Sequence, residues 1–162
     1  MAESKVQGES GGPKDSAPLT KEQVDEKARQ LLAQMSLKEK IQQMSGSTPL
    51  FPGLFEVWLA YNKRPLPSGG NARLSIPAMC FSDGPRGVVM NHSTCFPVTM
   101  ARGASWDTDL EERIGDAMGV EARSLGANVM GSVCINLLRH PAWGRGQETY
   151  GEDPCHLGEM GA

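Results

Sequence analysis

The segment from residue 139 to residue 154 constrains the fold of this chain more than any other stretch. It reads Arg-His-Pro-Ala-Trp-Gly-Arg-Gly-Gln-Glu-Thr-Tyr-Gly-Glu-Asp-Pro, and its three glycines and two prolines argue against a regular helix or strand. An apolar run, residues 129–138, enters the segment, and Asp153 followed by Pro154 is typical of a helix start. The order predicts a strand, a long polar loop and a helix. In parallel α/β folds, ligands bind at such loops, which follow the carboxyl ends of strands.

Three apolar runs predict strands. They cover residues 76–81, 96–104 and 129–138, and helical patterns alternate with them. This alternation predicts a parallel sheet with right-handed crossovers. The fold class is therefore α/β. Three strands and an unfinished helix do not complete a (β/α)8 barrel, which usually takes about 250 residues, so we interpret the chain as the leading part of a larger fold.

Helical patterns precede and separate the predicted strands. A first helix follows Thr20, and the capping-box pattern of residues 36–39 opens a second, short one. A third helix begins with Asp107 or Thr108 as its cap and stops at Gly126. Its predicted inner face consists of Leu110, Ile114, Ala117, Met118, Ala122 and Leu125.

Two other segments differ from this pattern. Residues 1–20 are rich in Gly, Ser, Pro, Lys and Glu, which predicts a disordered tail and an ordered portion at residues 21–162. Residues 46–74 are punctuated by proline and glycine, and a short helix over residues 54–61 fits their apolar side chains.

Composition excludes several classes of partner and location. A net charge of −3 gives no reason to expect nucleic acid or an acidic membrane surface as a partner. No uncharged stretch is long and apolar enough for a spanning helix, and the N-terminus lacks the apolar core of a signal peptide. Cys80, Cys95, Cys134 and Cys155 are widely spaced without zinc-ligand spacing, which predicts reduced thiols in a cytoplasmic protein.

Familiar catalytic motifs are missing from the sequence. It contains no G-x-G-x-x-G and no G-x-x-x-x-G-K-[ST], so a nucleotide cofactor has no support. It contains no G-x-S-x-G, so the sequence gives no support for a serine hydrolase. The three histidines are too scattered to predict a metal site.

Asp83 and Arg145 are the best candidates for a binding site. A carboxylate and a guanidinium beside Trp143 and Tyr150 suit a neutral polyhydroxylated ligand, because the carboxylate accepts from hydroxyls and the guanidinium donates a rigid fork. For Asp83 the alternative is that its carboxylate only holds a turn before Gly84. For Arg145 the alternative is that it pairs with Glu148 or Asp153 and braces its own loop. For Glu148, Glu152 and Asp153 we prefer bracing and helix-start roles.

Four motifs resemble the amino-terminal domain of glycoside hydrolase family 3, which includes the β-glucosidases. They are Ser-Asp-Gly-Pro-Arg-Gly at 82–87, Cys-Phe-Pro-Val-Thr-Met-Ala-Arg-Gly-Ala-Ser-Trp-Asp at 95–107, Glu-Ala-Arg-Ser-Leu-Gly-Ala-Asn at 121–128, and residues 140–154. The resemblance implies a TIM-type (β/α)8 barrel and an exo-acting, retaining hydrolase of O-glycosyl bonds in carbohydrate catabolism. It implies a small-molecule β-glucoside or oligosaccharide as partner and no cofactor.

The resemblance also implies roles for single residues. Asp83 matches the aspartate that binds sugar hydroxyls in the −1 subsite, and Arg145 matches an arginine lining the same subsite. Many relatives carry an arginine after Asp-Gly-Pro-x-Gly-Leu, where this chain has Val88 and Val89; Arg86 lies nearby as a replacement.

The nucleophile and the acid/base of the family come from later segments that have no counterpart here. We therefore expect no catalytic residue in the chain, inactivity of the chain alone, and dependence on a missing C-terminal part. The alternative is a noncatalytic remnant that folds with, or binds, a partner chain.

Overall fold

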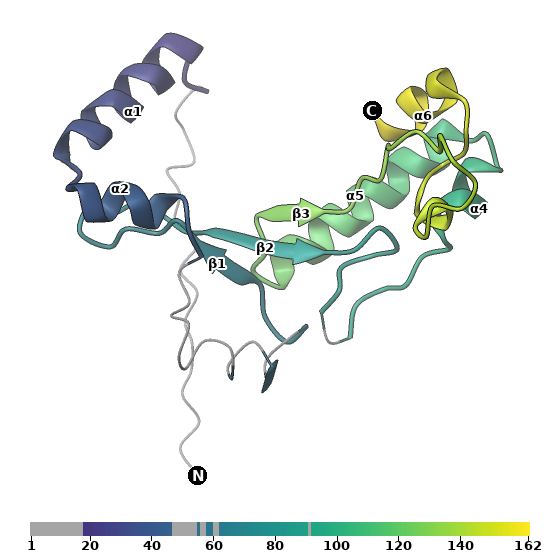
Figure 1. Ribbon diagram of the computed structural model, residues 1–162, viewed down its shortest axis with the longest axis horizontal. Helices are drawn as coiled ribbons and strands as arrows, with labels where there is room; N and C mark the ends of the chain where they lie inside the picture. Colours follow the sequence, from purple (N-terminus) through teal and green to yellow (C-terminus); the bar gives the residue numbers. More distant parts are fainter. Residues whose placement is uncertain (1–17, 47–54, 56–57, 60–61, 91) are drawn as a thin grey trace. The chain divides into compact units, whose positions relative to one another are not determined.

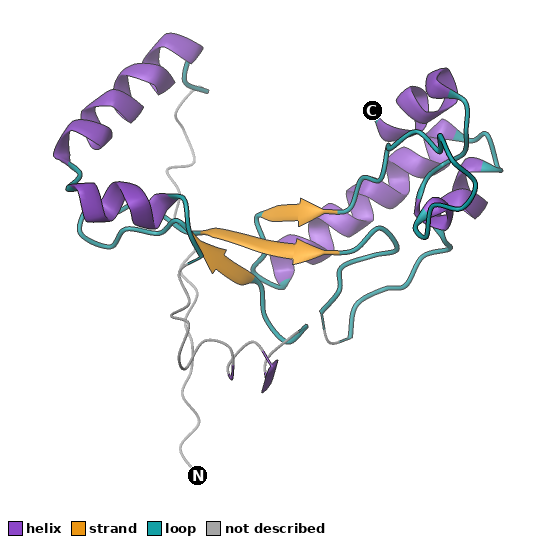
Figure 2. Cartoon of the chain, in the orientation of Figure 1, coloured by secondary structure: helices purple, strands orange, loops and turns teal. Residues whose placement is uncertain are grey.

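The computed structural model describes residues 18–46, 55, 58–59, 62–90 and 92–162, and the chain divides into two compact units, Met1–Ser36 and Leu37–Ala162. The predicted disorder of residues 1–17 and most of the predicted helix at 54–61 lie outside the described residues. Figure 1 labels the helices and strands along the chain, and Figure 2 distinguishes helices, strands and loops by colour.

The first unit carries helix α1, Lys21–Gln34, which confirms the predicted helix after Thr20. The side chain of Thr20 accepts a hydrogen bond from the backbone N–H of Gln23, and the side chain of Gln23 accepts from the backbone N–H of Thr20. This reciprocal capping box satisfies two donors that the first turn leaves without an intrahelical partner. None of the residues of α1 is buried.

The second unit contains a three-stranded sheet and the remaining described helices. In chain order its elements are α2 (Leu37–Gln43), β1 (Leu66–Ser68), β2 (Met79–Asp83), α4 (Thr99–Gly103), α5 (Thr108–Ser124), β3 (Val129–Gly131), the 3-10 helix η1 (Gly146–Glu148) and α6 (Pro154–Gly161).

The sheet has the strand order β1-β2-β3. Strands β2 and β3 are parallel, with Asp83 opposite Gly131, which confirms the predicted parallel sheet. Strand β1 pairs antiparallel with β2 and was not predicted. It contains Pro67 and lies at the edge of the sheet, which is where a residue without an N–H is tolerated in a strand.

The predicted strand at residues 96–104 is wrong, because helix α4 occupies most of it. The buried residues of α4 are Thr99, Arg102 and Gly103, and this spacing of three and four is helical. A short apolar run does not distinguish strand from helix by itself. The strand predicted at 129–138 is shorter than expected, since in the described chain its pairing ends at Gly131.

Helix α5 follows its predicted boundaries. The side chain of Asp107 accepts from the backbone N–H of Leu110 at 2.8 Å, and Gly126 ends the helix with φ of +85°. Ile114, Met118 and Ala122 are buried on its predicted inner face. Figure 1 shows α5 running alongside β2 and β3. One hydrophobic cluster there joins Val88, Met90, Ala122 and Ala127, with Leu125 and Met130 packed against it.

Helix α6 begins as predicted, with Asp153 as N-cap and Pro154 in the first turn. The carboxylate of Asp153 accepts from the backbone N–H of His156 at 2.8 Å. A second hydrophobic cluster, formed by Tyr150, Leu157 and Met160, fixes α6 to the loop before it. In the part of the chain that the structure describes, no helix has the length and hydrophobicity needed to cross a membrane.

A pair of glycine substitutions tests the contact between α4 and this loop. A Cβ on Gly103 would lie 2.0 Å from the carbonyl oxygen of Tyr150. We expect Gly103→Ala to lower the free energy of unfolding by about 1–3 kcal/mol, because the loop must move away. Gly115→Ala is the control: it meets nothing within 4 Å in helix α5, and should raise the free energy of unfolding by about 0.5–1 kcal/mol. Urea denaturation measures both, and equal values for the two variants would contradict the contact.

Candidate functional site

Asp83 ends strand β2 and turns into a glycine-rich loop. Its Oδ1 accepts a hydrogen bond from the backbone N–H of Gly84 at 2.9 Å, and no other described residue donates to this carboxylate. Gly84 has φ of +140°, and a Cβ there would lie 1.8 Å from the carbonyl oxygen of Gly87. Glycine is therefore required at position 84, and the turn holds Asp83 through one oxygen while the other stays available.

The neighbouring strand leaves room for the Asp83 side chain. Gly131 lies opposite Asp83 in the parallel register. A Cβ on Gly131 would lie 3.4 Å from Oδ1 of Asp83 and 2.8 Å from Cζ of Phe81. The absence of a side chain at Gly131 thus lets both neighbouring side chains lie over β3.

A small hollow of about 70 Å³ opens beside Asp83. Complete ligand pockets usually measure roughly 300–1,000 Å³, so this hollow corresponds to one wall of a site. Among the described residues that line it, Asp83 is the sole carboxylate, and Arg86 is not among them. The lining residues are Asn62, Arg64, Leu66, Phe81, Ser82, Asp83, Val89 and Met90.

Arg145 precedes η1 and forms a bidentate ion pair with Glu148. Its Nε donates to Oε1 at 2.9 Å and its Nη2 donates to Oε2 at 2.5 Å, while its side chain remains 64% exposed. The bracing contact considered from the sequence therefore exists, with Glu148 as the partner; Asp153 caps α6 instead. The hydrogen bond from Arg145 lowers the pKa of Glu148, and the same bond raises the pKa of Arg145.

Electrostatic coupling connects Asp83 with the Arg145 loop. The hydrogen bond to Glu148 is the largest cause of the raised pKa of Arg145. The negative charges of Cys134 and Asp83 make smaller contributions in the same direction. Burial is the main cause that raises the pKa of the Cys134 thiol. The negative charges of Glu148 and Asp83 raise this pKa further, and the positive charge of Arg145 lowers it. The Cys134 sulfur also lies 3.8 Å from Oε2 of Glu148. The structure thus brings both predicted binding residues within electrostatic range of one thiol.

Cys134 is a site residue that the sequence did not reveal. It comes three residues after Gly131, within the apolar run that the sequence predicts as a strand. Because pairing of β3 ends at Gly131, the chain that follows carries Cys134 toward Glu148. The raised thiol pKa favours the neutral form at pH 7.

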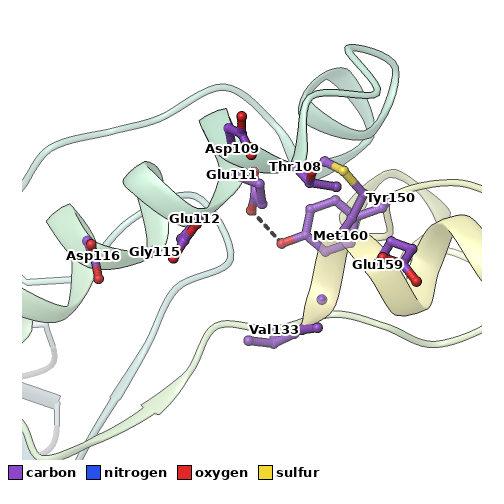
Figure 3. Close-up of a pocket in the computed structure, with 12 residues that line it drawn as sticks. Thr108, Asp109, Glu111, Glu112, Gly115, Asp116, Val133, Tyr150, Glu159 and Met160 are labelled. Carbon is purple, nitrogen blue, oxygen red and sulfur yellow. Dashed lines mark hydrogen bonds between the residues drawn. The ribbon is translucent and has the colours of Figure 1, made fainter.

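Tyr150 does not line the hollow beside Asp83, where the sequence suggested an aromatic face for a ligand. It is buried, and its hydroxyl donates to Oε1 of Glu111 at 2.6 Å. Burial is the main cause that raises the Tyr150 pKa, followed by the hydrogen bond to Glu111. Figure 3 shows this contact at the edge of a second pocket of about 440 Å³, between α5 and α6. Trp143 keeps 37% of its surface exposed.

A buried ion pair between Arg102 and Glu111 was also missed. Nη1 of Arg102 donates to Oε1 of Glu111 at 2.7 Å. Arg102 lies in the run predicted as a strand, and Glu111 lies in the first turn of a predicted helix, where acidic residues are common. No local pattern indicates that the two meet. Within the described residues, no group of three His, Cys, Asp or Glu side chains is arranged to hold a metal ion.

Removal of Arg145 tests the electrostatics of its loop. We expect Arg145→Ala to raise the pKa of Glu148 toward its ordinary value, because the lost hydrogen bond is the main cause of the depression. A depressed carboxyl pKa stabilises the fold above the unfolded-state pKa, and this stabilisation is lost as the pH falls through the folded-state pKa. Carbon-13 NMR titration of the Glu148 carboxyl measures the shift. Arg139→Ala, in the same exposed loop, is the control, and an unchanged Glu148 pKa in Arg145→Ala would contradict the pairing.

Comparisons with known proteins agree on the family. The family described as "Glycosyl hydrolase family 3 N terminal domain" matches residues 23–162. A probable β-glucosidase I of Emericella nidulans is 42% identical over 94 residues, which cover 54% of this chain and 11% of that protein. A β-glucosidase of Rhizobium radiobacter is 34% identical over 132 residues, covering 77% of this chain and 14% of that protein.

Solved structures give the same result. β-Glucosidase 3B from Thermotoga neapolitana, in complex with α-D-glucose, matches with a TM-score of 0.73 and 32% identity over 83% of this chain. The match covers 20% of that protein, so the chain spans a small part of the relatives it resembles. The shared fold is the leading part of the family's α/β barrel domain. The chain belongs to the glycosyl hydrolase family 3 N-terminal domain family.

Proposed function

We propose that this chain supplies part of the −1 sugar-binding subsite of an exo-acting, retaining β-glucosidase-like hydrolase. Asp83 and Arg145 are the residues that hold the sugar. The observation that carries the proposal is geometric. Gly131 lies opposite Asp83 at the end of β2, and Cys134, three residues later, lies 3.8 Å from the Glu148 carboxylate that holds Arg145.

The chemistry of the two side chains supports a neutral polyhydroxylated ligand. One oxygen of Asp83 accepts from Gly84, and the other remains available to accept from a sugar hydroxyl. Arg145 is oriented by Glu148, and no described residue accepts from its Nη1. The negative charge of Glu148 balances Arg145, so the loop presents donors without a strong net attraction for anions.

The comparisons support the substrate class. The Thermotoga neapolitana β-glucosidase 3B and a β-glucosidase from Kluyveromyces marxianus were both solved as complexes with glucose. By extension to this chain, the ligand is the terminal glucose unit of a β-glucoside or oligosaccharide. No cofactor is part of this proposal.

Asp83 and Arg145 bind and do not perform the acid, base or nucleophilic steps. A retaining glycosidase needs two carboxyl groups about 5–5.5 Å apart across the scissile bond. The hollow beside Asp83 contains one carboxylate among its described lining residues. We therefore assign the nucleophile and the acid/base to later segments of the family's proteins, which have no counterpart in this chain.

A second proposal is that the chain folds with, or binds, a partner chain and performs no catalysis. The supporting observation is the apolar surface beyond β3, where Val133 is 56% exposed and Ile135 is 52% exposed. Apolar side chains next to an edge strand favour pairing with another strand.

The free thiols of Cys80, Cys95, Cys134 and Cys155 suit a reducing compartment, and we propose a cytoplasmic location on that basis.

Substitution of Asp83 tests the binding role. In the protein as its organism produces it, Asp83→Ala should lower kcat/KM for an aryl β-glucoside by at least about tenfold, since a hydrogen bond to a charged group contributes roughly 1.5–3 kcal/mol. Asp116→Ala, an exposed position on α5, is the matched control and should leave kcat/KM unchanged. Unchanged kinetics in Asp83→Ala would exclude Asp83 from the subsite.

The isolated 162-residue chain tests where the catalytic carboxylates lie. We expect no hydrolysis of an aryl β-glucoside above the rate with buffer alone, because binding groups without a nucleophile and an acid do not complete the reaction. Measurable turnover that disappears in Asp83→Ala would show that the chain itself contains the catalytic groups. Sedimentation of the same sample shows whether it associates, as the second proposal requires.

A further inference from the structure

A single buried guanidinium connects the two loops that carry Asp83 and Arg145. Arg102, on α4, is 4% exposed. Its Nη2 donates to the backbone carbonyl of Pro85 at 2.5 Å, two residues after Asp83. Its Nη1 donates to Oε1 of Glu111 at 2.7 Å. The loop after β2 is therefore fixed to α4 and, through Glu111, to α5.

The same network reaches the Arg145 loop through Tyr150. The hydroxyl of Tyr150 donates to the Glu111 oxygen that also accepts from Arg102. The Arg102 guanidinium carbon lies 5.7 Å from the centre of the Tyr150 ring, within the range of a cation–π contact. Tyr150 follows Glu148, the partner of Arg145, by two positions. Figure 3 shows Tyr150 and Glu111 facing each other.

Backbone contacts hold the Tyr150 segment against α4 as well. Gly103 approaches the carbonyl of Tyr150 so closely that a Cβ would lie 2.0 Å from its oxygen. A ring nitrogen of His156, on α6, is 2.9 Å from the carbonyl oxygen of Gly103. The distance between the Asp83 loop and the Arg145 loop thus depends on one helical turn whose central contact is Arg102.

We propose that Arg102 is a positioning residue for sugar binding: it sets the placement of Asp83 relative to Arg145 without touching the ligand. This inference rests on the proposed sugar-binding function. Arg102 is not among the described residues that line the hollow beside Asp83, so its effect passes through Pro85 on one side and Tyr150 on the other.

The geometry requires arginine at this position. A guanidinium is planar and donates in two directions at once, so it reaches the Pro85 carbonyl and the Glu111 carboxylate while its face lies against Tyr150. A lysine in place of Arg102 would keep the positive charge beside Glu111 but would lack the planar guanidinium that donates to Pro85 and Glu111 at the same time. The substitution Arg102→Lys therefore separates charge from geometry.

The experiment compares Arg102→Lys with Arg123→Lys, an exposed position in the last turn of α5, in the protein as its organism produces it. The readouts are the melting temperature, the Kd for glucose, and kcat and KM for an aryl β-glucoside. We expect Arg102→Lys to fold, to raise the glucose Kd and to lower kcat/KM by about ten- to a hundredfold, since small misplacements of binding groups have effects of this size. Arg123→Lys should match the unsubstituted protein.

A double-mutant cycle with Asp83→Ala distinguishes positioning from general destabilisation. If Arg102 acts through Asp83, Arg102→Lys has a smaller effect on kcat/KM in the Asp83→Ala background than in the unsubstituted protein. Equal effects in the two backgrounds, or a lowered melting temperature with an unchanged glucose Kd, would overturn the proposal.

The outcomes also separate this inference from the proposed function. If Asp83→Ala has no effect, the sugar-binding function fails and the positioning role fails with it. If Asp83→Ala lowers kcat/KM and Arg102→Lys does not, only the positioning role is wrong.

If Arg102→Lys does not fold, the variant Tyr150→Phe replaces it in the experiment. This substitution removes the hydrogen bond to Glu111 and keeps the aromatic ring against Arg102. It should change the glucose Kd in the same direction, and an unchanged Kd would overturn the proposal.

Discussion

The buried ion pair between Arg102 and Glu111 is the interaction on which the second unit depends most. Burial of two charges is costly unless further hydrogen bonds satisfy them. Here Pro85 and Tyr150 supply such bonds, while Nε of Arg102 and Oε2 of Glu111 are buried without a hydrogen-bond partner among the described residues. Removal of one partner from a buried pair typically costs about 3–5 kcal/mol, because the other charge stays buried without compensation. The pair thus links α4 and α5 with the loops around Asp83 and Tyr150.

The candidate site follows from this arrangement. Asp83 is held by a glycine turn at the end of β2, and Arg145 is held by Glu148 at the start of η1. An exposed ion pair such as Arg145–Glu148 adds little stability, so its effect lies in the orientation of the guanidinium. The deeper network of Arg102 then determines how far apart the two loops lie. Binding groups at the surface and a rigid buried support are thus separate parts of the same site.

Features that depend on neighbouring residues were predictable. The caps of α5 and α6 at Asp107 and Asp153 form as expected, because a capping side chain bonds to a backbone N–H within three residues. The parallel pairing of β2 and β3 also agreed with the order of the elements. The run at 96–104 was read with the wrong period, because an apolar run of that length fits a strand or a buried helical turn equally well.

Local chemistry determined the helix ends and the two residues proposed to bind sugar, since each of these has a signature within a few positions. The order of strands and helices along the chain determined the α/β class. Tertiary packing alone decided that Tyr150 is buried with Arg102 and Glu111, and that Cys134 lies beside Glu148. These contacts join residues whose partners are chosen by the close approach of separate segments. Charge and hydrophobicity patterns along a chain indicate which side chains can be buried, but a buried charge finds its partner only when the segments pack.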